Sequence, residues 1–204
     1  MIGFPAEFGV MTSAAHGMIP LGIQEGRRWA YDNECFGDSF DPRRFLDGIQ
    51  RLAASEYRED CLFVVAPDVV GDARATLHLY GEWEHRIKAT SFPVAFVAQD
   101  GQEALDFPLA FDWLFIGGTT EWKLSDAADE CIRRAKRLGK PVHVGRVNSI
   151  KRIRHFQIME VDSVDGTFPI YEPDTARARL AKPLAQPPLL SLLHQPVSDR
   201  HHRR

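Results

Sequence analysis

Short apolar runs alternate with amphipathic stretches along most of the chain. Strands buried on both faces are indicated by unbroken apolar runs at 62–66, 94–98 and 113–116. Weaker runs predict further strands at 8–11, 28–31, 141–144 and 161–164. Apolar residues three and four positions apart predict helices over 41–54, 72–87, 125–138 and 150–158, with a short helix near 103.

The regular alternation of strand and helix is typical of parallel strands joined by crossover helices. Seven or eight such units favour an α/β fold of the (β/α)₈ TIM-like barrel type. An open doubly wound sheet is the alternative, but no G-x-G-x-x-G motif follows a first strand and no P-loop is present. We expect a compact barrel domain over 1–176 and a Pro-rich C-terminal extension over 177–204, with a short helix and a mobile basic tail.

Composition narrows the class of protein. The 204 residues, 44% of them hydrophobic, can bury a substantial core. No apolar run approaches the roughly 20 residues of a membrane helix, and the N-terminus does not resemble a signal peptide, so we predict a cytoplasmic protein without membrane contact. The three cysteines are widely separated, which argues against a disulfide framework. We predict no metal and no cofactor.

Charge is unevenly distributed although the net charge is only −3. No acidic residue lies between Cys131 and Met159, a window that carries nine basic residues: Arg133, Arg134, Lys136, Arg137, Lys140, Arg146, Lys151, Arg152 and Arg154. A basic block in a mildly acidic protein suits contact with a phosphate backbone. Two helices with solvated Lys/Arg faces are the other interpretation.

Polar residues and glycines directly follow the predicted strands. In a parallel barrel, such positions meet at the carboxyl rim, where functional side chains gather. The set comprises Asp32, Asn33, Glu34, Asp68, Gln99, Asp100, Gly117, Gly118, Thr119, Thr120, Glu121, Gly145, Arg146, Asn148, Asp165, Gly166 and Thr167. Some of these have ordinary alternatives as turn residues or helix caps. Together they suit a flat, hydrogen-bonding ligand and acid/base or nucleophilic chemistry.

Six segments, in order, resemble the queuine-type tRNA-guanine transglycosylase family, whose barrel exchanges guanine for a 7-deazaguanine. They are Tyr31-Asp-Asn-Glu-Cys-Phe36, Ala66-Pro-Asp68, Val97-Ala-Gln-Asp-Gly101, Ile116-Gly-Gly118, Val142-His-Val-Gly145 and Val161-Asp-Ser-Val-Asp165. The resemblance covers residues 28–170. It implies a barrel fold and a pentosyltransferase activity.

The resemblance also assigns roles to residues. It implies that Asp165 is the nucleophile that attacks the ribose and that Asp32 is the acid/base. The predicted base-binding residues are Asn33, Phe36, Asp68, Gln99, Gly117, Gly118, Val144 and Gly145, with Phe36 and Val144 enclosing the base and Asp68 and Gln99 reading its edge. Arg146, Lys151, Arg152 and Arg154 are the predicted contacts to the nucleic-acid backbone.

Departures from the family pattern point to the substrate. The tRNA enzymes carry a C-x-C-x-x-C…H zinc element after the nucleophile, whereas no cysteine follows Asp165 here. Glu34 and Cys35 replace two family glycines, and an acidic residue beyond the glycine pair is displaced to Glu121. A short barrel of this kind looks like the phage and bacterial relatives that act on DNA. We therefore expect DNA rather than tRNA, a free 7-deazaguanine as second substrate, and a flipped or single-stranded target nucleotide.

Two other functions stay open at this stage. One is a catalytically inactive relative that binds nucleic acid or a deazaguanine, although both Asp32 and Asp165 are present. The other is an unrelated barrel enzyme such as an aldolase, for which Lys123 and Lys140 are poorly placed and no metal motif exists. A homodimer or a partner protein that supplies the docking surface also stays open.

Overall fold

Seven short parallel strands form one sheet in the computed structural model, which describes residues 8–37 and 39–166. The strands lie side by side in chain order, without any reversal: β1 Val10–Thr12, β2 Trp29–Tyr31, β3 Cys61–Val65, β4 Val94–Ala98, β5 Trp113–Ile116, β6 Val142–Val144 and β7 Ser163–Val164. All seven strands expected from the apolar runs are therefore present. The sequential order excludes a doubly wound sheet, in which the strand order reverses.

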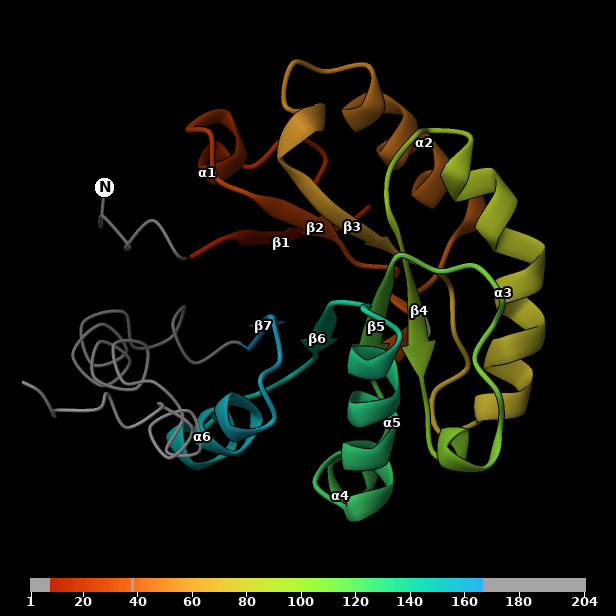
Figure 1. The fold of residues 1–204 in the computed structure, drawn as a ribbon. Coiled ribbons are helices and arrows are strands. Elements are labelled where there is room, and N and C mark those ends of the chain that lie inside the picture. The colour runs from red at the N-terminus through yellow and green to blue at the C-terminus, as the bar shows by residue number, and fades with distance from the viewer. Residues whose placement is uncertain (1–7, 38, 167–204) are drawn as a thin grey trace, which may run out of the picture.

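Helices connect successive strands and cover the convex side of the sheet (Figure 1). The α-helices are α1 Leu21–Gln24, α2 Pro42–Ala53, α3 Ala73–Lys88, α4 Thr120–Lys123, α5 Asp126–Arg137 and α6 Ile150–Ile158. Single 3₁₀ turns are formed by Cys35–Gly37, Arg58–Asp60 and Gln102–Ala104. The helix α4 was not expected from the sequence, because four residues are too short to show a helical period.

The prediction of a closed (β/α)₈ barrel is wrong. The sheet is strongly curled but open, a half-barrel of seven strands in which β1 and β7 are the two edges of the described part of the chain. Alternation in the sequence predicts strands and their parallel connections, but closure also requires an eighth strand that pairs with β1. The C-terminal extension over 177–204 lies outside the described residues.

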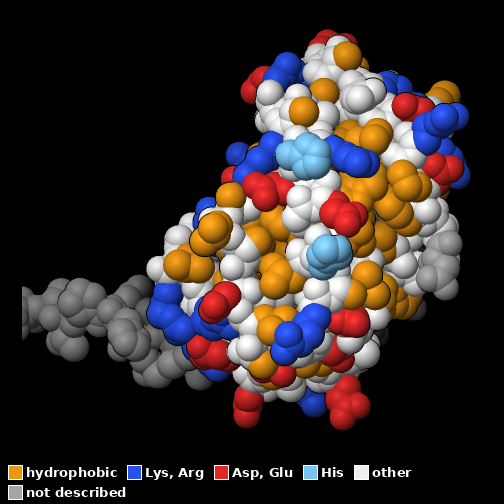
Figure 2. Space-filling model, turned by 90° about the vertical axis from the view of Figure 1, so that its right-hand side faces the viewer, with side chains coloured by type: hydrophobic (Ala, Val, Ile, Leu, Met, Phe, Trp, Pro, Cys, Tyr) orange, Lys and Arg blue, Asp and Glu red, His pale blue; other side chains and the backbone are white. Residues whose placement is uncertain are grey.

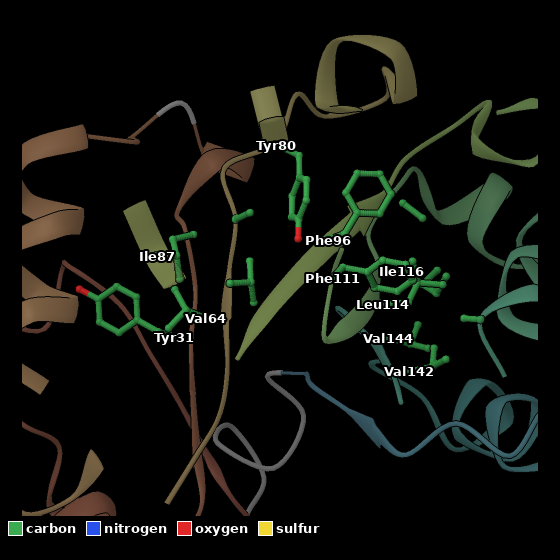
Figure 3. Close-up of a cluster of buried hydrophobic side chains, with 14 of the residues drawn as sticks. Tyr31, Val64, Tyr80, Ile87, Phe96, Phe111, Leu114, Ile116, Val142 and Val144 are labelled. Atoms are coloured by element: carbon green, nitrogen blue, oxygen red, sulfur yellow. The ribbon is translucent and has the colours of Figure 1, made fainter. Parts of the chain in front are cut away.

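The two faces of the sheet carry different residues because strand side chains alternate in direction. The main core lies between the sheet and the helices and includes Tyr31, Val64, Phe96, Ile116 and Val144 (Figure 3). A smaller cluster formed by strand residues lines the concave face: Ala30, Phe63, Val65, Ala95, Val97 and Phe115. The concave face is therefore apolar in its depth, and its polar residues lie at the rim.

Short polar side chains begin several of the helices. Asp41 Oδ1 accepts the N–H groups of Arg43 and Arg44 at 2.9 and 3.1 Å, and Asp72 accepts that of Ala75 at 3.0 Å. Ser149 likewise caps α6. Ser125 occupies the cap position of α5, but its hydroxyl donates to the Trp122 carbonyl instead.

Gly48 in α2 is required by a close approach of Tyr31. A Cβ at this position would lie 1.9 Å from the Tyr31 hydroxyl oxygen, whose side chain is fully buried. We expect Gly48→Ala to lower the free energy of unfolding by about 1–3 kcal/mol, because a well-packed core resists added volume. Gly81→Ala in α3 meets no atom within 4 Å and should instead stabilise by about 0.5–1 kcal/mol through helix propensity. Urea unfolding of both variants tests this opposite pair of signs.

Among the helices of the described residues, none combines the length and apolar character needed to cross a membrane.

Candidate functional site

The carboxyl ends of the strands form the rim of the concave face. On β6 and β7 the pairing joins His143 to Ser163 and Val144 to Val164. His143 contacts the concave cluster, whereas Val144 belongs to the outer core, so alternation directs the residues after β7 and β6, Asp165 and Gly145, inward again. A Cβ on Gly145 would lie 2.7 Å from the Phe115 ring and 3.5 Å from Asp165 Oδ2, which agrees with this orientation.

Asp165 is held through both of its carboxylate oxygens. Oδ1 accepts the Arg146 N–H at 2.7 Å, and Oδ2 lies 3.0 Å from His143 Nε2. The other ring nitrogen of His143 lies 2.8 Å from the Ser163 hydroxyl. A neutral ring with its hydrogen on Nε2 satisfies both contacts, because Ser163 then donates to Nδ1. The chain Ser163–His143–Asp165 fixes the orientation of the carboxylate.

Asp165 and Asp32 have pKa values shifted in opposite directions. Burial by itself would raise the pKa of Asp165, but the hydrogen bond and charge of His143, the Arg146 N–H and the nearby Lys123 hold it below its ordinary value. Burial raises the pKa of Asp32 from 3.8 to about 6, and the negative charge of Asp165 adds to this rise. At neutral pH the first carboxyl is ionised and the second is close to its own midpoint, a division of roles used by paired catalytic carboxylates.

Asp68 joins two amide side chains in a buried network. Its Oδ1 accepts from Asn33 Nδ2 at 2.6 Å, and its Oδ2 accepts from Gln99 Nε2 at 2.5 Å. Burial raises the pKa of Asp68, while these two amides and Arg146 oppose the rise. Asn33 also donates to the Ala66 carbonyl at 2.7 Å, which ties the rim after β2 to the end of β3.

Gln99 is the link between this network and the glycine pair. Its Oε1 accepts the N–H groups of Gly71 and Gly118, both at 2.9 Å. Gly117 must lack a side chain, since a Cβ would lie 2.7 Å from Gln99 Nε2, and Gly118 has a φ of 61°. In this structure the Gly118 N–H is therefore engaged by Gln99, so a ligand that takes this donor must exchange one hydrogen bond for another.

Arg146 lies across the mouth of the site. Its guanidinium donates to the Gly118 carbonyl at 2.6 Å and stacks over the Phe36 ring at 3.8 Å from the centroid. Phe36 itself is 64% exposed, an unusual position for a large aromatic side chain. These contacts place Phe36 at the rim, and they place Arg146 at the site itself rather than with the three basic residues of α6.

Val144 is the one predicted site residue that the structure separates from the others. Its side chain is fully buried between the sheet and the helices. The inward neighbours on either side of it, His143 and Gly145, occupy the concave face instead. The remaining predicted residues of the rim lie in one network or beside it: Asp32, Asn33, Phe36, Asp68, Gln99, Gly117, Gly118, Gly145 and Asp165.

The basic block divides into two parts. On α5, Arg133 and Arg137 both pair with Glu130, and Lys136 pairs with Asp162. Lys151, Arg152 and Arg154 of α6 form no ion pair with any acidic residue of the described chain, and the helix begins directly after the rim loop. The face seen from the side of α3 mixes acidic and basic side chains (Figure 2). The first turns of α6 are therefore the unneutralised basic surface closest to the site.

Three residues near the carboxylates received no role from the sequence. His143 is 4% exposed, and its signal is the two-residue period that connects it to Gly145. Cys35 follows Asn33, and burial raises the pKa of its thiol to about 12 beside Asp68 and Asp32. Lys123 is 4% exposed, and its Nζ donates to the Gly145 carbonyl, so the view that it is poorly placed for the site is wrong.

No cluster of three or more His, Cys, Asp or Glu residues with the geometry of a metal site exists in residues 8–37 and 39–166. Comparison with known proteins assigns the chain to no group: no protein-family model matches it, and no curated protein matches it.

Proposed function

We propose that the protein is a base-exchange glycosyltransferase that replaces guanine in a nucleic acid with a 7-deazaguanine. The observation that carries this proposal is the pair of rim carboxyls with opposite pKa shifts, Asp165 ionised and Asp32 titrating near pH 6. A double displacement with retained configuration requires one carboxylate nucleophile and one proton shuttle. The resemblance of six rim segments to the transglycosylase family supports the same assignment.

In the first step, an oxygen of Asp165 attacks C1′ of the target nucleotide. The C1′–N9 bond breaks, its electron pair leaves with guanine, and protonated Asp32 delivers the proton that the departing base requires. The product is an ester between Asp165 and C1′. The contacts of Asp165 with His143 and the Arg146 N–H keep the carboxylate ionised and oriented for this attack.

In the second step, the deazaguanine enters the place that guanine left. Ionised Asp32 accepts the N9 proton of the incoming base, N9 attacks C1′, and the C1′–oxygen bond breaks. Asp165 is released as a carboxylate and Asp32 is again protonated, so both groups return to their initial state. A pKa of about 6 suits Asp32 to both the acid and the base role near neutral pH.

Base selection is assigned to the network of Asp68, Asn33 and Gln99. A carboxylate has about four acceptor positions, and Asp68 uses one on each oxygen for an amide. The remaining positions suit the N1–H and 2-amino donors of guanine and of its deaza analogues. Adenine lacks these donors and would leave the buried carboxylate unpaired, which opposes its binding strongly.

The nucleic acid is assigned to the rim and to the first turns of α6. DNA is the expected substrate, in line with the relatives that the short chain resembles. The backbone phosphates would lie along Lys151, Arg152 and Arg154, and Phe36 with Arg146 would stack on the displaced base or its neighbour.

Removal of two exposed charges on α6 should weaken nucleic-acid binding and its dependence on salt. We expect Lys151→Ala with Arg154→Ala to reduce the slope of log affinity against log salt by about 2, one for each lost phosphate contact. Arg133→Ala with Arg137→Ala removes the same charge from α5, where both residues pair with Glu130, and should change the slope little. Fluorescence anisotropy of a labelled single-stranded DNA across a NaCl series measures both. Equal slopes in the two double variants would contradict the assignment to α6.

The activity is tested by release of label from nucleic acid that contains radioactive guanine. The protein is incubated with single-stranded DNA, duplex DNA or tRNA and with unlabelled 7-cyano- or 7-aminomethyl-7-deazaguanine. Release that depends on the added base is the expected result, with DNA as the better substrate. A covalent adduct on denaturing gels distinguishes an enzyme from a binder. Binding of the base without release or adduct would overturn the proposed activity in favour of a non-catalytic binding protein.

A further inference from the structure

The peptide between Gly145 and Arg146 connects Asp165 to a buried lysine. The N–H of this peptide donates to Asp165 Oδ1 at 2.7 Å, and its carbonyl accepts from Lys123 Nζ. Arg146 has a φ of 60°, in the left-handed region that disfavours residues other than glycine. Such a conformation costs about 1 kcal/mol or more and persists only where its surroundings fix it. The contact with Lys123 is one of the contacts that fix it.

Lys123 is buried among charges of both signs. It ends α4, and burial is the largest cause that lowers its pKa from 10.5 to about 8. The cations of Arg146 and Arg152 lower the pKa further, whereas the anions of Asp165 and Asp100 oppose them. A lysine that only covered apolar surface would extend its ammonium into water. Here the ammonium instead points to a backbone carbonyl one peptide away from Asp165.

We propose that Lys123 is a positioning residue for Asp165, and that its ammonium holds the Gly145–Arg146 peptide so that the Arg146 N–H faces the carboxylate. A peptide whose carbonyl accepts from a cation becomes a stronger donor at its N–H, because successive hydrogen bonds polarise each other. Lys123 thereby favours the ionised form of Asp165 through the backbone as well as through its charge. The catalytic consequence, though not the positioning, rests on the proposed base exchange.

The arrangement makes Asp165 sensitive to the protonation of Lys123. Below about pH 8 the lysine is charged and the peptide is held by a charge-assisted hydrogen bond. As the pH rises through that value, the neutral amine becomes a weaker donor and its attraction for Asp165 is lost. Base exchange should therefore decline above about pH 8. Lys123→Arg should move this decline to higher pH, because a guanidinium stays charged.

The experiment measures the pKa of Asp165 directly by ¹³C NMR on protein with labelled aspartate, with the resonance assigned from Asp165→Asn. Lys123→Met should raise the pKa of Asp165 and lower the exchange rate by up to about 10²-fold. Lys123→Arg should restore both towards the wild-type values. Lys88→Met, which removes a surface lysine paired with Glu84 in α3, is the control and should change neither.

An unchanged pKa of Asp165 in Lys123→Met would overturn the proposal. The wild-type protein gives a second test that needs no variant: the Asp165 resonance should show a step near pH 8 as Lys123 titrates, and its absence would equally overturn the proposal. Both readouts are independent of activity. A protein that exchanges no base but shows the step would refute the proposed function while leaving the positioning of Asp165 intact.

Discussion

Replacement of Asp165 by asparagine is expected to lower the rate of base exchange by about 10³-fold or more while the protein stays folded. The amide keeps the size of the side chain and an oxygen that can accept the Arg146 N–H. It lacks the negative charge and the second oxygen with which a carboxylate forms an ester to C1′. Release of labelled guanine and the covalent adduct should both be lost.

The same substitution should change the titration of Asp32. The charge of Asp165 is the second cause of the raised pKa of Asp32, so its removal should lower that pKa below about 6. Burial is the larger cause and persists, so the pKa should stay above 3.8. ¹³C NMR titration of labelled aspartate measures this shift.

Asp162→Asn is the matched control for Asp165→Asn. Asp162 lies just before β7, at the opposite end of the strand from the rim, where its Oδ2 accepts from Lys136 and from the Val142 N–H. Exchange by this variant should remain close to wild type. Full activity in Asp165→Asn, or an equal loss in both variants, would refute the role of Asp165 as nucleophile.

Replacement of Asp32 by asparagine is expected to remove activity and to stabilise the fold at neutral pH. Loss of a proton shuttle lowers an enzymatic rate by about 10²–10⁴-fold. The carboxyl of Asp32 accepts the backbone N–H groups of Asn33 and Glu34, which an amide oxygen can also accept. The substitution therefore removes a buried charge and retains an acceptor for these donors.

The sign of the stability change follows from the pKa of Asp32. Burial raises it from 3.8 to about 6 in the folded protein, so the folded state binds a proton more tightly than the unfolded state. The resulting stabilisation is fully present below about pH 3.8 and is lost as the pH rises through about 6. Above that pH the ionised carboxylate opposes folding, by up to about 3 kcal/mol for a shift of this size.

Thermal unfolding at pH 4 and at pH 7.5 separates these contributions. Asp32→Asn should unfold at a higher temperature than wild type at pH 7.5 and show little advantage at pH 4. Asp47→Asn, an exposed substitution in α2, should change the unfolding temperature little at either pH. A variant of Asp32 that is less stable than wild type at pH 7.5 would contradict the burial of a charged carboxylate at this position.

The sequence predicted the strands well because each is a short apolar run that ends at a polar residue or a glycine. Residues at the ends of parallel strands share one edge of a sheet, so Asp32, Asp68, Gln99 and Asp165 were expected to meet. Closure of the barrel was not predictable in the same way. It depends on whether an eighth strand pairs with β1, which no periodicity within the other seven strands can decide.

Val144 and Lys123 illustrate two different limits of sequence reasoning. Val144 received its role from the resemblance alone, but the pairing of Val144 with Val164 directs both away from Asp165. A strict two-residue count back from Asp165 would have selected Ser163 instead, and the same count back from Gly145 would have selected His143. Lys123 gave no such signal, because it lies on a four-residue helix and reaches the site only through a backbone carbonyl.

The sequential order of the strands has a consequence for how the site is assembled during synthesis. Each strand pairs with the one made just before it, so the half-barrel can grow from its N-terminal edge as the chain emerges from the ribosome. Asp32, Asp68 and Gln99 follow β2, β3 and β4, whereas Asp165 follows the seventh strand. The nascent protein therefore completes its surface for reading a base well before it acquires the group that breaks the glycosidic bond.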